Sequence, residues 1–561
     1  MTTKHISLKL GDKEFRLRNH ELARVSLKEA AFEEQPEIAA SLKRANIGVD
    51  LAPDLSPMLD DDQAYMNYID GEWIASETDR FRDNVNPANR RELLGRTPVS
   101  TGDEVDRAMK AADRDFMEWM TISGDFKLKA FLRVADLLKQ HAPELERIMC
   151  REMGKTLFDC HLDVAEAIGV VEVVAPMALS MKGATHQKIV NGTAMECRLS
   201  PRGVAVIITP FNFPLAIPIA QVLSALVTGN TVVWKPSHLT PEVSHAMAKL
   251  ILTALKDTGQ RMHVKVPRGI LNVYFGAGSA TASHPIPKVI HFTGSKDIGD
   301  KVDSIASGLG KKVMKEVAGI NITYVHKAAD LSKAVRQIIY GKTITGGQRC
   351  SSIQEVLADH EVCDKLLDML AKEATQIVTG DGASKEVTEA DATPGRYSLP
   401  PLADDEQLRH VKDLLERGVK EGARITYQDE PPQELLDAGF YHPFTIVTDV
   451  DETNCLYYEE IFGPVLVVTK VKDVHEAIST INQKVGIVAC IHTEDKNASE
   501  FFIERVLRTR IDDGRHGTGC FWSTKFGGDR GAGSGNSALD CDMVYSYVIY
   551  KTVYRQFTEP K

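Results

Sequence analysis

The chain has 561 residues, of which 43% are hydrophobic and 26% charged, and its formal net charge is −11. This length favours several domains, and the composition is that of an ordinary globular protein. The negative charge argues against a general nucleic-acid-binding protein, which needs a basic face to displace counterions.

No run of about 18 apolar residues is present to cross a bilayer, and the N-terminus lacks the apolar core of a signal peptide. Nine cysteines are scattered without a Cys-x-x-Cys pair, so neither a disulfide framework nor a zinc site is indicated. We therefore expect a cytoplasmic protein with no metal and with no membrane or nucleic-acid partner. The glycosylation acceptor pattern at Asn191 is interpreted as a turn.

Residues 1–64 are expected to form an N-terminal extension. They contain a possible strand pair at Ile6–Leu10 and Phe15–Leu17, a helical pattern at Leu27–Ala40 and a turn-rich, charged boundary at Asp60–Asp62. The apolar content of this segment argues against a disordered tail. We expect it to pack on the surface or to cover a subunit contact.

From about Tyr68 the chain alternates between strand and helix patterns. Helices are predicted at Val105–Met117 and Leu132–Lys139. The apolar runs Gly203–Ile208 and Thr231–Trp234 are typical of buried parallel strands, and Ala216–Thr228 fits the helix that connects them. This βαβ unit predicts a doubly wound sheet.

Two segments have the pattern of association elements. Gln187–Val190 and Thr193–Cys197 flank Asn191-Gly192, a dipeptide favoured in two-residue hairpin turns. Val544–Tyr554 is β-branched and aromatic throughout, which predicts a strand. An ordinary edge hairpin inside one subunit remains the alternative.

Cys350 is the candidate nucleophile, and Glu316 is the candidate base. Cys350 lies in Gly346-Gly347-Gln348-Arg349-Cys350-Ser351-Ser352, and Glu316 lies in Lys315-Glu316-Val317-Ala318-Gly319. A glycine-rich turn exposes a sulfur and offers backbone N–H groups to an oxyanion, and a separate carboxylate can remove a proton from water. A lone cysteine is more often a small buried hydrophobe, so further motifs are needed to favour catalysis.

Those motifs are present. With Cys350 and Glu316 separated by 34 positions, the chain resembles the aldehyde dehydrogenase superfamily. The resemblance extends over roughly 490 residues and is carried by further motifs in family order: Tyr68-Ile69-Asp70-Gly71-Glu72-Trp73, Asn86-Pro87, Glu152-Met153-Gly154-Lys155, Thr209-Pro210-Phe211-Asn212-Phe213-Pro214, Gly229-Asn230-Thr231-Val232-Val233-Trp234-Lys235-Pro236-Ser237, Phe292-Thr293-Gly294-Ser295, Glu459-Glu460-Ile461-Phe462-Gly463-Pro464-Val465 and Phe526-Gly527-Gly528.

The resemblance implies an α/β fold with three parts. A doubly wound cofactor-binding domain is expected at residues 65–183 and 201–317, and an α/β catalytic domain at 318–539. A small β bridging and oligomerisation domain is expected from the hairpin at 184–200 and the strand at 540–558, which implies a homodimer or homotetramer.

The resemblance also implies oxidation of an aldehyde to a carboxylic acid with NAD or NADP, through a cysteine thiohemiacetal and thioester. Cys350 is the implied nucleophile, Asn212 donates to the oxyanion and Glu316 activates water. The implied cofactor-binding residues are Thr209, Pro210, Phe211, Lys235, Ser237, His238, Gly294, Ser295, Gly299, Glu460 and Phe462.

Two departures concern the adenosine end of the cofactor. His238 replaces the glutamate with which many NAD-preferring relatives repel a 2′-phosphate, so the exclusion of NADP is in doubt. The segment between Gly278 and His284 is also shorter than the usual helix there.

Arg349, Ser351 and Phe213 are candidate substrate contacts. An arginine beside the nucleophile suits a carboxylate or phosphate on the substrate, but Arg349 can equally point inward and brace the loop. Phe211 before Asn212-Phe213-Pro214, together with Ser351-Ser352, resembles the pyrroline-5-carboxylate (glutamate semialdehyde) branch of the family, which implies a semialdehyde substrate. Two alternatives to hydrolytic oxidation remain: a CoA-acylating semialdehyde dehydrogenase, disfavoured by Glu316, and a catalytically silent structural member of the family.

Overall fold

The computed structural model describes residues 5–10, 13–18, 53–185, 193–276, 278–317, 319–519, 524–535 and 541–557. The chain divides into two compact units, Met1–Asp54 and Leu55–Lys561. In the first unit, β1 (His5–Leu10) pairs with β2 (Lys13–Arg18) in antiparallel fashion, as the sequence predicts. The helix predicted at Leu27–Ala40 lies outside the described residues.

The large unit contains two sheets of seven strands. The first has the order β13-β12-β9-β10-β11-β3-β4. Its parallel strands are β9 (Val204–Ile208), β10 (Thr231–Lys235), β11 (Leu271–Val273), β12 (Val289–Gly294) and β13 (Lys312–Val317), and its antiparallel edge is formed by β3 (Asn67–Ile69) and β4 (Glu72–Ile74).

Helices cover this sheet, and their sequences explain their places. Every residue of α6 (Ala216–Val227) is buried, because it is almost entirely apolar and connects two buried strands. Thr101 begins the amphipathic α2 with a capping box completed by Glu104. The βαβ unit and the helices predicted near Val105 and Leu132 are therefore confirmed. The helices of this part are α2 (Gly102–Thr121), α3 (Gly124–Met153), α4 (Leu157–Val174), α5 (Met177–Ser180), α6, α7 (Pro241–Met262), α8 (Gly278–Ser283) and α9 (Lys296–Gly308).

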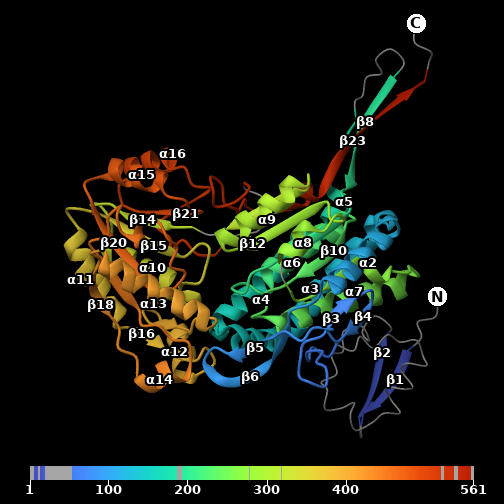
Figure 1. Ribbon diagram of the computed structural model, residues 1–561, viewed down its shortest axis with the longest axis horizontal. Coiled ribbons are helices and arrows are strands. Elements are labelled where there is room, and N and C mark those ends of the chain that lie inside the picture. Colours follow the sequence, from blue (N-terminus) through green and yellow to red (C-terminus); the bar gives the residue numbers. More distant parts are fainter. Residues whose placement is uncertain are drawn as a thin grey trace. The chain divides into compact units, whose positions relative to one another are not determined.

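The second sheet has the order β18-β19-β20-β15-β14-β21-β22 and is parallel except at β18 (Figure 1). Its strands are β14 (Asn321–Val325), β15 (Ile353–Asp359), β18 (Arg424–Gln428), β19 (Thr445–Thr448), β20 (Val465–Val471), β21 (Val488–His492) and β22 (Arg510–Asp513). The helices beside it are α10 (Leu331–Thr343), α11 (Cys363–Ala374), α12 (Lys385–Ala392), α13 (Asp405–Lys420), α14 (Gln433–Ala438), α15 (Val474–Gln483) and α16 (Lys496–Arg505). A short parallel pair, β16 (Ile377–Thr379) and β17 (Tyr397–Leu399), completes this part.

A third, three-stranded sheet has the order β23-β8-β7. β8 (Thr193–Pro201) pairs with β23 (Val548–Gln556) along its whole length and with β7 (Ala184–Thr185), and the β8–β23 ribbon extends away from α5 (Figure 1). The predicted Asn191-Gly192 turn lies outside the described residues.

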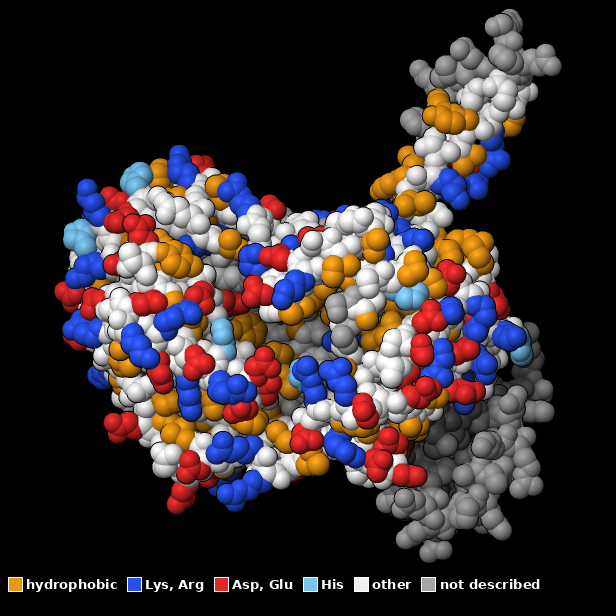
Figure 2. All heavy atoms as spheres, viewed as in Figure 1, with side chains coloured by type: hydrophobic (Ala, Val, Ile, Leu, Met, Phe, Trp, Pro, Cys, Tyr) orange, Lys and Arg blue, Asp and Glu red, His pale blue; other side chains and the backbone are white. Residues whose placement is uncertain are grey.

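The C-terminal strand begins later than predicted. The segment Cys541–Tyr547 is a 3-10 helix, and the strand starts only at Val548. Met543, Val544 and Tyr547 are buried in the core of the large unit, which a helical turn allows and an extended arm does not. Beyond that point exposed apolar side chains lie along the β8–β23 ribbon, called the arm below, at Ile549, Tyr550, Tyr554 and Phe557. Figure 2 shows apolar and basic side chains together on this arm.

A separate hairpin packs beside the first sheet. β5 (Phe81–Asn86) pairs with β6 (Asn89–Pro98), and the register places Arg82 opposite Thr97. Among the helices of the described residues, none combines the length and the apolar character that crossing a membrane requires.

Candidate active site

The loop that carries Cys350 has an unusual backbone. It joins the end of α10 to β15, and Thr345, Gly346 and Gly347 have φ values of 55°, 63° and 76°. A Cβ at Gly347 would lie 2.5 Å from the carbonyl oxygen of Gly463, so glycine is required there. Three successive left-handed residues thus turn the chain sharply just before the cysteine.

The Cys350 thiol lies in an environment that disfavours its ionised form. Burial raises its pKa to about 12, with further contributions from the negative charges of Glu316 and Glu460, and the positive charge of Arg349 opposes them. The thiol is therefore protonated at neutral pH in the protein alone. Formation of the thiolate requires a nearby base or a positive charge brought by a ligand.

Glu316, near the end of β13, is 1% exposed. The backbone N–H of Gly528 donates to both carboxylate oxygens, at 2.7 and 2.9 Å. On its other side the carboxylate is confined by Gly533, where a Cβ would lie 2.7 Å from Oε2. Burial raises the pKa of Glu316 to about 8, although the Gly528 hydrogen bond lowers it. A carboxylate with such a pKa is able to accept and release a proton near neutral pH.

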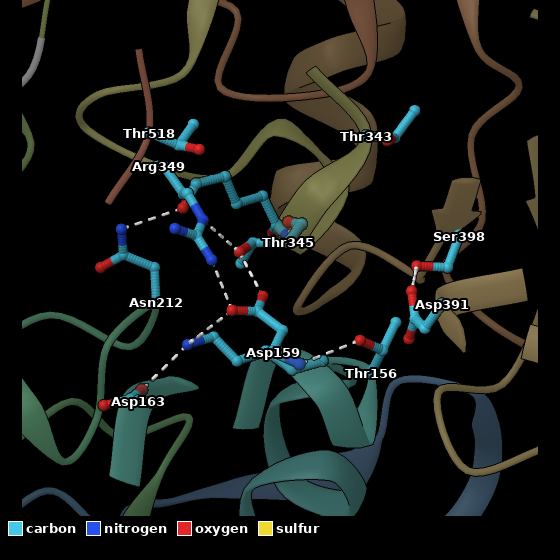
Figure 3. Close-up of polar contacts among 12 residues, drawn as sticks. Thr156, Asp159, Asp163, Asn212, Thr343, Thr345, Arg349, Asp391, Ser398 and Thr518 are labelled. Carbon is cyan, nitrogen blue, oxygen red and sulfur yellow. Dashed lines mark hydrogen bonds and ion pairs between the residues drawn. The ribbon is translucent and has the colours of Figure 1, made fainter. Parts of the chain in front are cut away.

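Asn212 lies in the loop after β9 and is buried. Its side-chain amide donates to the carbonyl of Gln348 at 2.9 Å, which fixes its orientation beside the nucleophile loop (Figure 3). Gln348 is held in turn, since its Nε2 donates to Thr345 and its Oε1 accepts from the backbone N–H of Ala403. A primary amide has two hydrogens, so a second one is left for an oxyanion.

Arg349 points into the protein. One guanidinium nitrogen lies 2.5 Å from Asp159, and Nε donates to Thr345 Oγ1 at 2.7 Å (Figure 3). The guanidinium carbon also lies over the ring of Phe213, 4.8 Å from its centre. The hydroxyl of Thr345 also donates to Asp159 at 2.5 Å. Of the two alternatives for Arg349, these contacts favour the bracing of the loop over contact with an anionic substrate, because the partners of the guanidinium are buried protein groups.

The arginine belongs to a buried charge cluster that consists of Lys155, Asp159, Asp163 and Arg349. Lys155 Nζ lies 2.9 Å from Asp163, 3.9 Å from Asp159 and 4.0 Å from the ring centre of Phe213. Although burial raises the pKa of Asp159, the positive charges of Arg349 and Lys155 lower it below its ordinary value. The sequence interpretation missed both aspartates; their positions four and eight residues after Lys155, on one face of α4, are the signal that could have found them.

The other candidate substrate contacts are close to this cluster. The Lys155 ammonium and the Arg349 guanidinium both lie over the ring of Phe213. Ser351 is buried, and the neighbouring Ser352 donates its hydroxyl to the carbonyl of Gly341 at 3.2 Å.

The first sheet has a topological switch point between β9 and β12. β9 and β12 are neighbouring parallel strands, but β10 follows β9 on one side and β13 follows β12 on the other. Nucleotides bind at the carboxyl ends of the strands where the order reverses in this way. Gly294 ends β12 and Ser295 begins α9, where no side chain of the described residues caps the helix. Gly299 in its first turn lets the helix pack closely, since a Cβ would lie 2.6 Å from Val317. A helix N-terminus in this position suits a pyrophosphate.

The remaining candidate cofactor contacts lie around the same strand ends. Phe211, which follows Pro210, meets Phe462 edge to face with ring centres 6.2 Å apart. Thr209 accepts a hydrogen bond from the Trp234 indole at 2.9 Å. The Ser237 hydroxyl accepts from the backbone N–H of Leu239 at 3.2 Å, in the loop that follows Lys235 and contains His238.

Glu460 has an unpredicted neighbour. Burial raises the pKa of Glu460 to about 8, against the positive charge of Lys342. Burial in turn lowers the pKa of Lys342 to about 7, against the charge of Glu460. Lys342 was missed because a lysine inside a helical pattern is normally solvated.

Comparison with known proteins agrees with this geometry. The aldehyde dehydrogenase family model matches residues 73–553. The chain belongs to the aldehyde dehydrogenase family. Malonate-semialdehyde dehydrogenase of Listeria monocytogenes is 31% identical over 444 residues, which are 78% of this chain and 86% of that protein. Alpha-ketoglutarate semialdehyde dehydrogenase of Haloferax volcanii is 29% identical over 503 residues, 88% of this chain and 99% of that protein.

A solved structure shows the same fold. Betaine aldehyde dehydrogenase from Staphylococcus aureus, in complex with NAD+, superimposes with a TM-score of 0.81 and 25% identity, over 89% of this chain and 95% of that one. The predicted family and α/β fold class are thereby confirmed. The chain is an NAD(P)-dependent aldehyde dehydrogenase.

Proposed function

We propose that this enzyme oxidises a semialdehyde, an aldehyde that also carries a carboxylate, to a cysteine thioester. Hydrolysis of this thioester then releases the dicarboxylic acid. The position of Glu316 supports the hydrolytic step. Its carboxylate is buried, accepts a hydrogen bond from the Gly528 N–H and lies close enough to Cys350 to raise the pKa of the thiol. The semialdehyde class is supported by the two relatives named above.

The proposed mechanism uses three residues in turn. Once the Cys350 thiol has given its proton to a base or to solvent, the thiolate attacks the aldehyde carbon. The negative oxygen of the thiohemiacetal then accepts hydrogen bonds from the Asn212 amide and from the backbone N–H of Cys350. A bound NAD(P) would supply the hydride acceptor, and loss of the hydride from this carbon would leave a thioester on Cys350. Glu316 then takes a proton from the water that attacks the thioester carbon, and the carboxylate product leaves as the thiolate returns.

The residues at the sheet's switch point fit a dinucleotide. The Gly294–Ser295 turn would hold the pyrophosphate at the N-terminus of α9, and Lys235 with Ser237 would lie at the adenosine ribose. Glu460, Phe462, Phe211, Pro210 and Thr209 would contact the other half. We accordingly assign cofactor binding to residues 65–183 and 201–317 and catalysis to 318–539.

Specificity for the substrate carboxylate requires a cation, and Arg349 is already engaged by Asp159. We propose that Arg349 braces the nucleophile loop and that another group reads the carboxylate. The relatives named above are malonate-semialdehyde and alpha-ketoglutarate semialdehyde dehydrogenases, so we propose the semialdehyde class and not glutamate semialdehyde in particular.

A substrate panel tests this function. Malonate, alpha-ketoglutarate and glutamate semialdehydes are compared with neutral aldehydes of matched length, with and without CoA, by the absorbance of the reduced cofactor. We expect faster reduction with semialdehydes, free acid as the product and no stimulation by CoA. Dependence on CoA and formation of an acyl-CoA would favour the acylating alternative. Failure of every aldehyde in the panel to reduce the cofactor would favour a catalytically silent structural member.

We also propose a homo-oligomer held by the arm of β8 and β23, with 184–200 and 540–558 as its bridging elements. Isolated ribbons are marginal in water, and this one exposes Ile549, Tyr550 and Tyr554.

A further inference from the structure

Basic side chains lie close together at the carboxyl end of β10. Lys235 is the last residue of this strand, and His238 follows three positions later. The hairpin of β5 and β6 packs on the loop that joins β10 to α7, where the Thr97 hydroxyl donates to the His238 carbonyl at 2.9 Å. Arg82, the register partner of Thr97, places a guanidinium nitrogen 3.1 Å from His238 Nε2.

Among the described residues, no negative group balances this set of side chains. Within the described part of the chain, no carboxylate comes within ion-pair distance of Arg82, Lys235 or His238; the Lys235 ammonium donates only to the carbonyl of Pro236, at 3.1 Å. Burial lowers the pKa of Lys235 to about 8, and Arg82 lowers it further. Burial, Arg82 and Lys235 together lower the pKa of His238 to about 3. The positive charges of Arg82 and Lys235 lie close together without a counter-charge, which is unfavourable in the protein without a ligand and favours a bound anion.

The position of these residues in the fold indicates which anion. β9, α6 and β10 form the βαβ unit at the switch point, and the end of the second strand of such a unit meets the ribose of the adenosine. An acidic residue there hydrogen-bonds the ribose 2′-hydroxyl of NAD, whereas an arginine accommodates the 2′-phosphate of NADP. This chain has Lys235 at the strand end, His238 where an acid would repel a phosphate, and Arg82 beside both.

We propose that Arg82, presented by the β5–β6 hairpin, is a specificity-determining residue that binds the 2′-phosphate of NADP, so that the enzyme prefers NADP to NAD. His238 orients Arg82: its neutral ring accepts one guanidinium N–H and leaves the others for the phosphate oxygens. The inference rests on the family's use of NAD(P) but not on the identity of the aldehyde.

Binding of nucleotide fragments tests the proposal without any catalysis. Isothermal titration calorimetry compares adenosine 2′,5′-bisphosphate with adenosine 5′-monophosphate for the wild type, Arg82→Gln and Arg91→Gln. Arg91 is the matched control, since it is an exposed arginine at the far end of the same hairpin. Melting temperatures show whether each variant is folded.

We expect the wild type to bind the bisphosphate at least about tenfold more tightly than the monophosphate, a preference that weakens with added salt. Arg82→Gln should lose about tenfold to a hundredfold on the bisphosphate alone, and Arg91→Gln should lose nothing. The kcat/KM ratio of NADP to NAD should fall in parallel. Equal binding of the two fragments by the wild type, or equal losses on both in Arg82→Gln, overturns the proposal. If Arg82→Gln does not fold, Arg82→Lys takes its place. This variant should weaken binding of the bisphosphate alone and keep part of the preference, and equal losses on both fragments would overturn the proposal.

Discussion

The role assigned to Glu316 predicts how turnover depends on pH. A general base acts in its ionised form, and a pKa of about 8 means that about a tenth of Glu316 is ionised at pH 7 and about half at pH 8. Because burial has raised the pKa of this carboxyl, activity should increase over a correspondingly higher pH range than it would with an ordinary glutamate. Where thioester hydrolysis limits turnover, kcat should therefore rise about fiftyfold between pH 6 and pH 8 and level off above pH 9.

The variant Glu316→Gln isolates this step. The amide keeps the shape and one oxygen acceptor for the Gly528 N–H, but it removes the base. In stopped-flow measurements we expect a burst of reduced cofactor near one equivalent per site, followed by turnover about 10²- to 10⁴-fold slower than in the wild type. The rise between pH 6 and pH 8 should disappear from the slow phase.

Glu152→Gln is the control for loss of a buried acid. Glu152 is likewise buried and accepts backbone N–H groups from Glu242 and Val243, but it lies in α3 and outside the proposed chemistry. Its burst and pH profile should match those of the wild type. Loss of the burst in Glu316→Gln would refute the assignment to hydrolysis and show that Glu316 acts earlier, on the Cys350 thiol; an unchanged pH profile would assign the rise to another group.

The remaining predictions concern single residues and the arm. Cys350→Ser should abolish oxidation while leaving cofactor binding and the melting temperature intact, and more than a few per cent residual rate would mean a different nucleophile. Asp159→Asn should lower the free energy of unfolding by about 3–5 kcal/mol, since Arg349 loses its buried partner; unchanged denaturant midpoints would contradict this. His238→Glu should shift the NAD/NADP ratio several-fold toward NAD, and a constant ratio would place the adenosine elsewhere. Deletion of Val548–Lys561, which spares the buried residues before it, should give smaller or aggregated species by light scattering; a truncated protein of native mass would assign β23 to packing within one subunit.

The sequence predicted the elements whose signals are local. The apolar runs Gly203–Ile208 and Thr231–Trp234 became adjacent parallel strands because burial on both faces selects such runs. The strand predicted at Val544–Tyr554 begins later than its β-branched pattern indicates, because burial of Val544 and Tyr547 against the core outweighs strand propensity.

The site details that were missed depend on contacts between distant parts of the chain. Arg349 faces inward because Asp159, 190 residues earlier in the chain, lies beneath the nucleophile loop. Arg82 had no signal of its own as an exposed arginine in a strand, and only the docking of a hairpin brings it to His238, 156 residues away. Side-chain direction follows the tertiary fold, and residue type alone does not specify it.

The buried charge cluster constrains how the sequence can change. Lys155 and Arg349 are balanced by Asp159 and Asp163 where water is excluded, so the four formal charges cancel. Replacing any one member leaves a net charge in the interior, whereas replacing Asp159 and Arg349 together by neutral residues of similar size removes both members of a pair. The cost of the double replacement should therefore be smaller than the sum of the two single ones. We therefore expect paired substitutions at these positions to be tolerated better than single ones. The loop that carries the cysteine and α4 should accordingly change in sequence together.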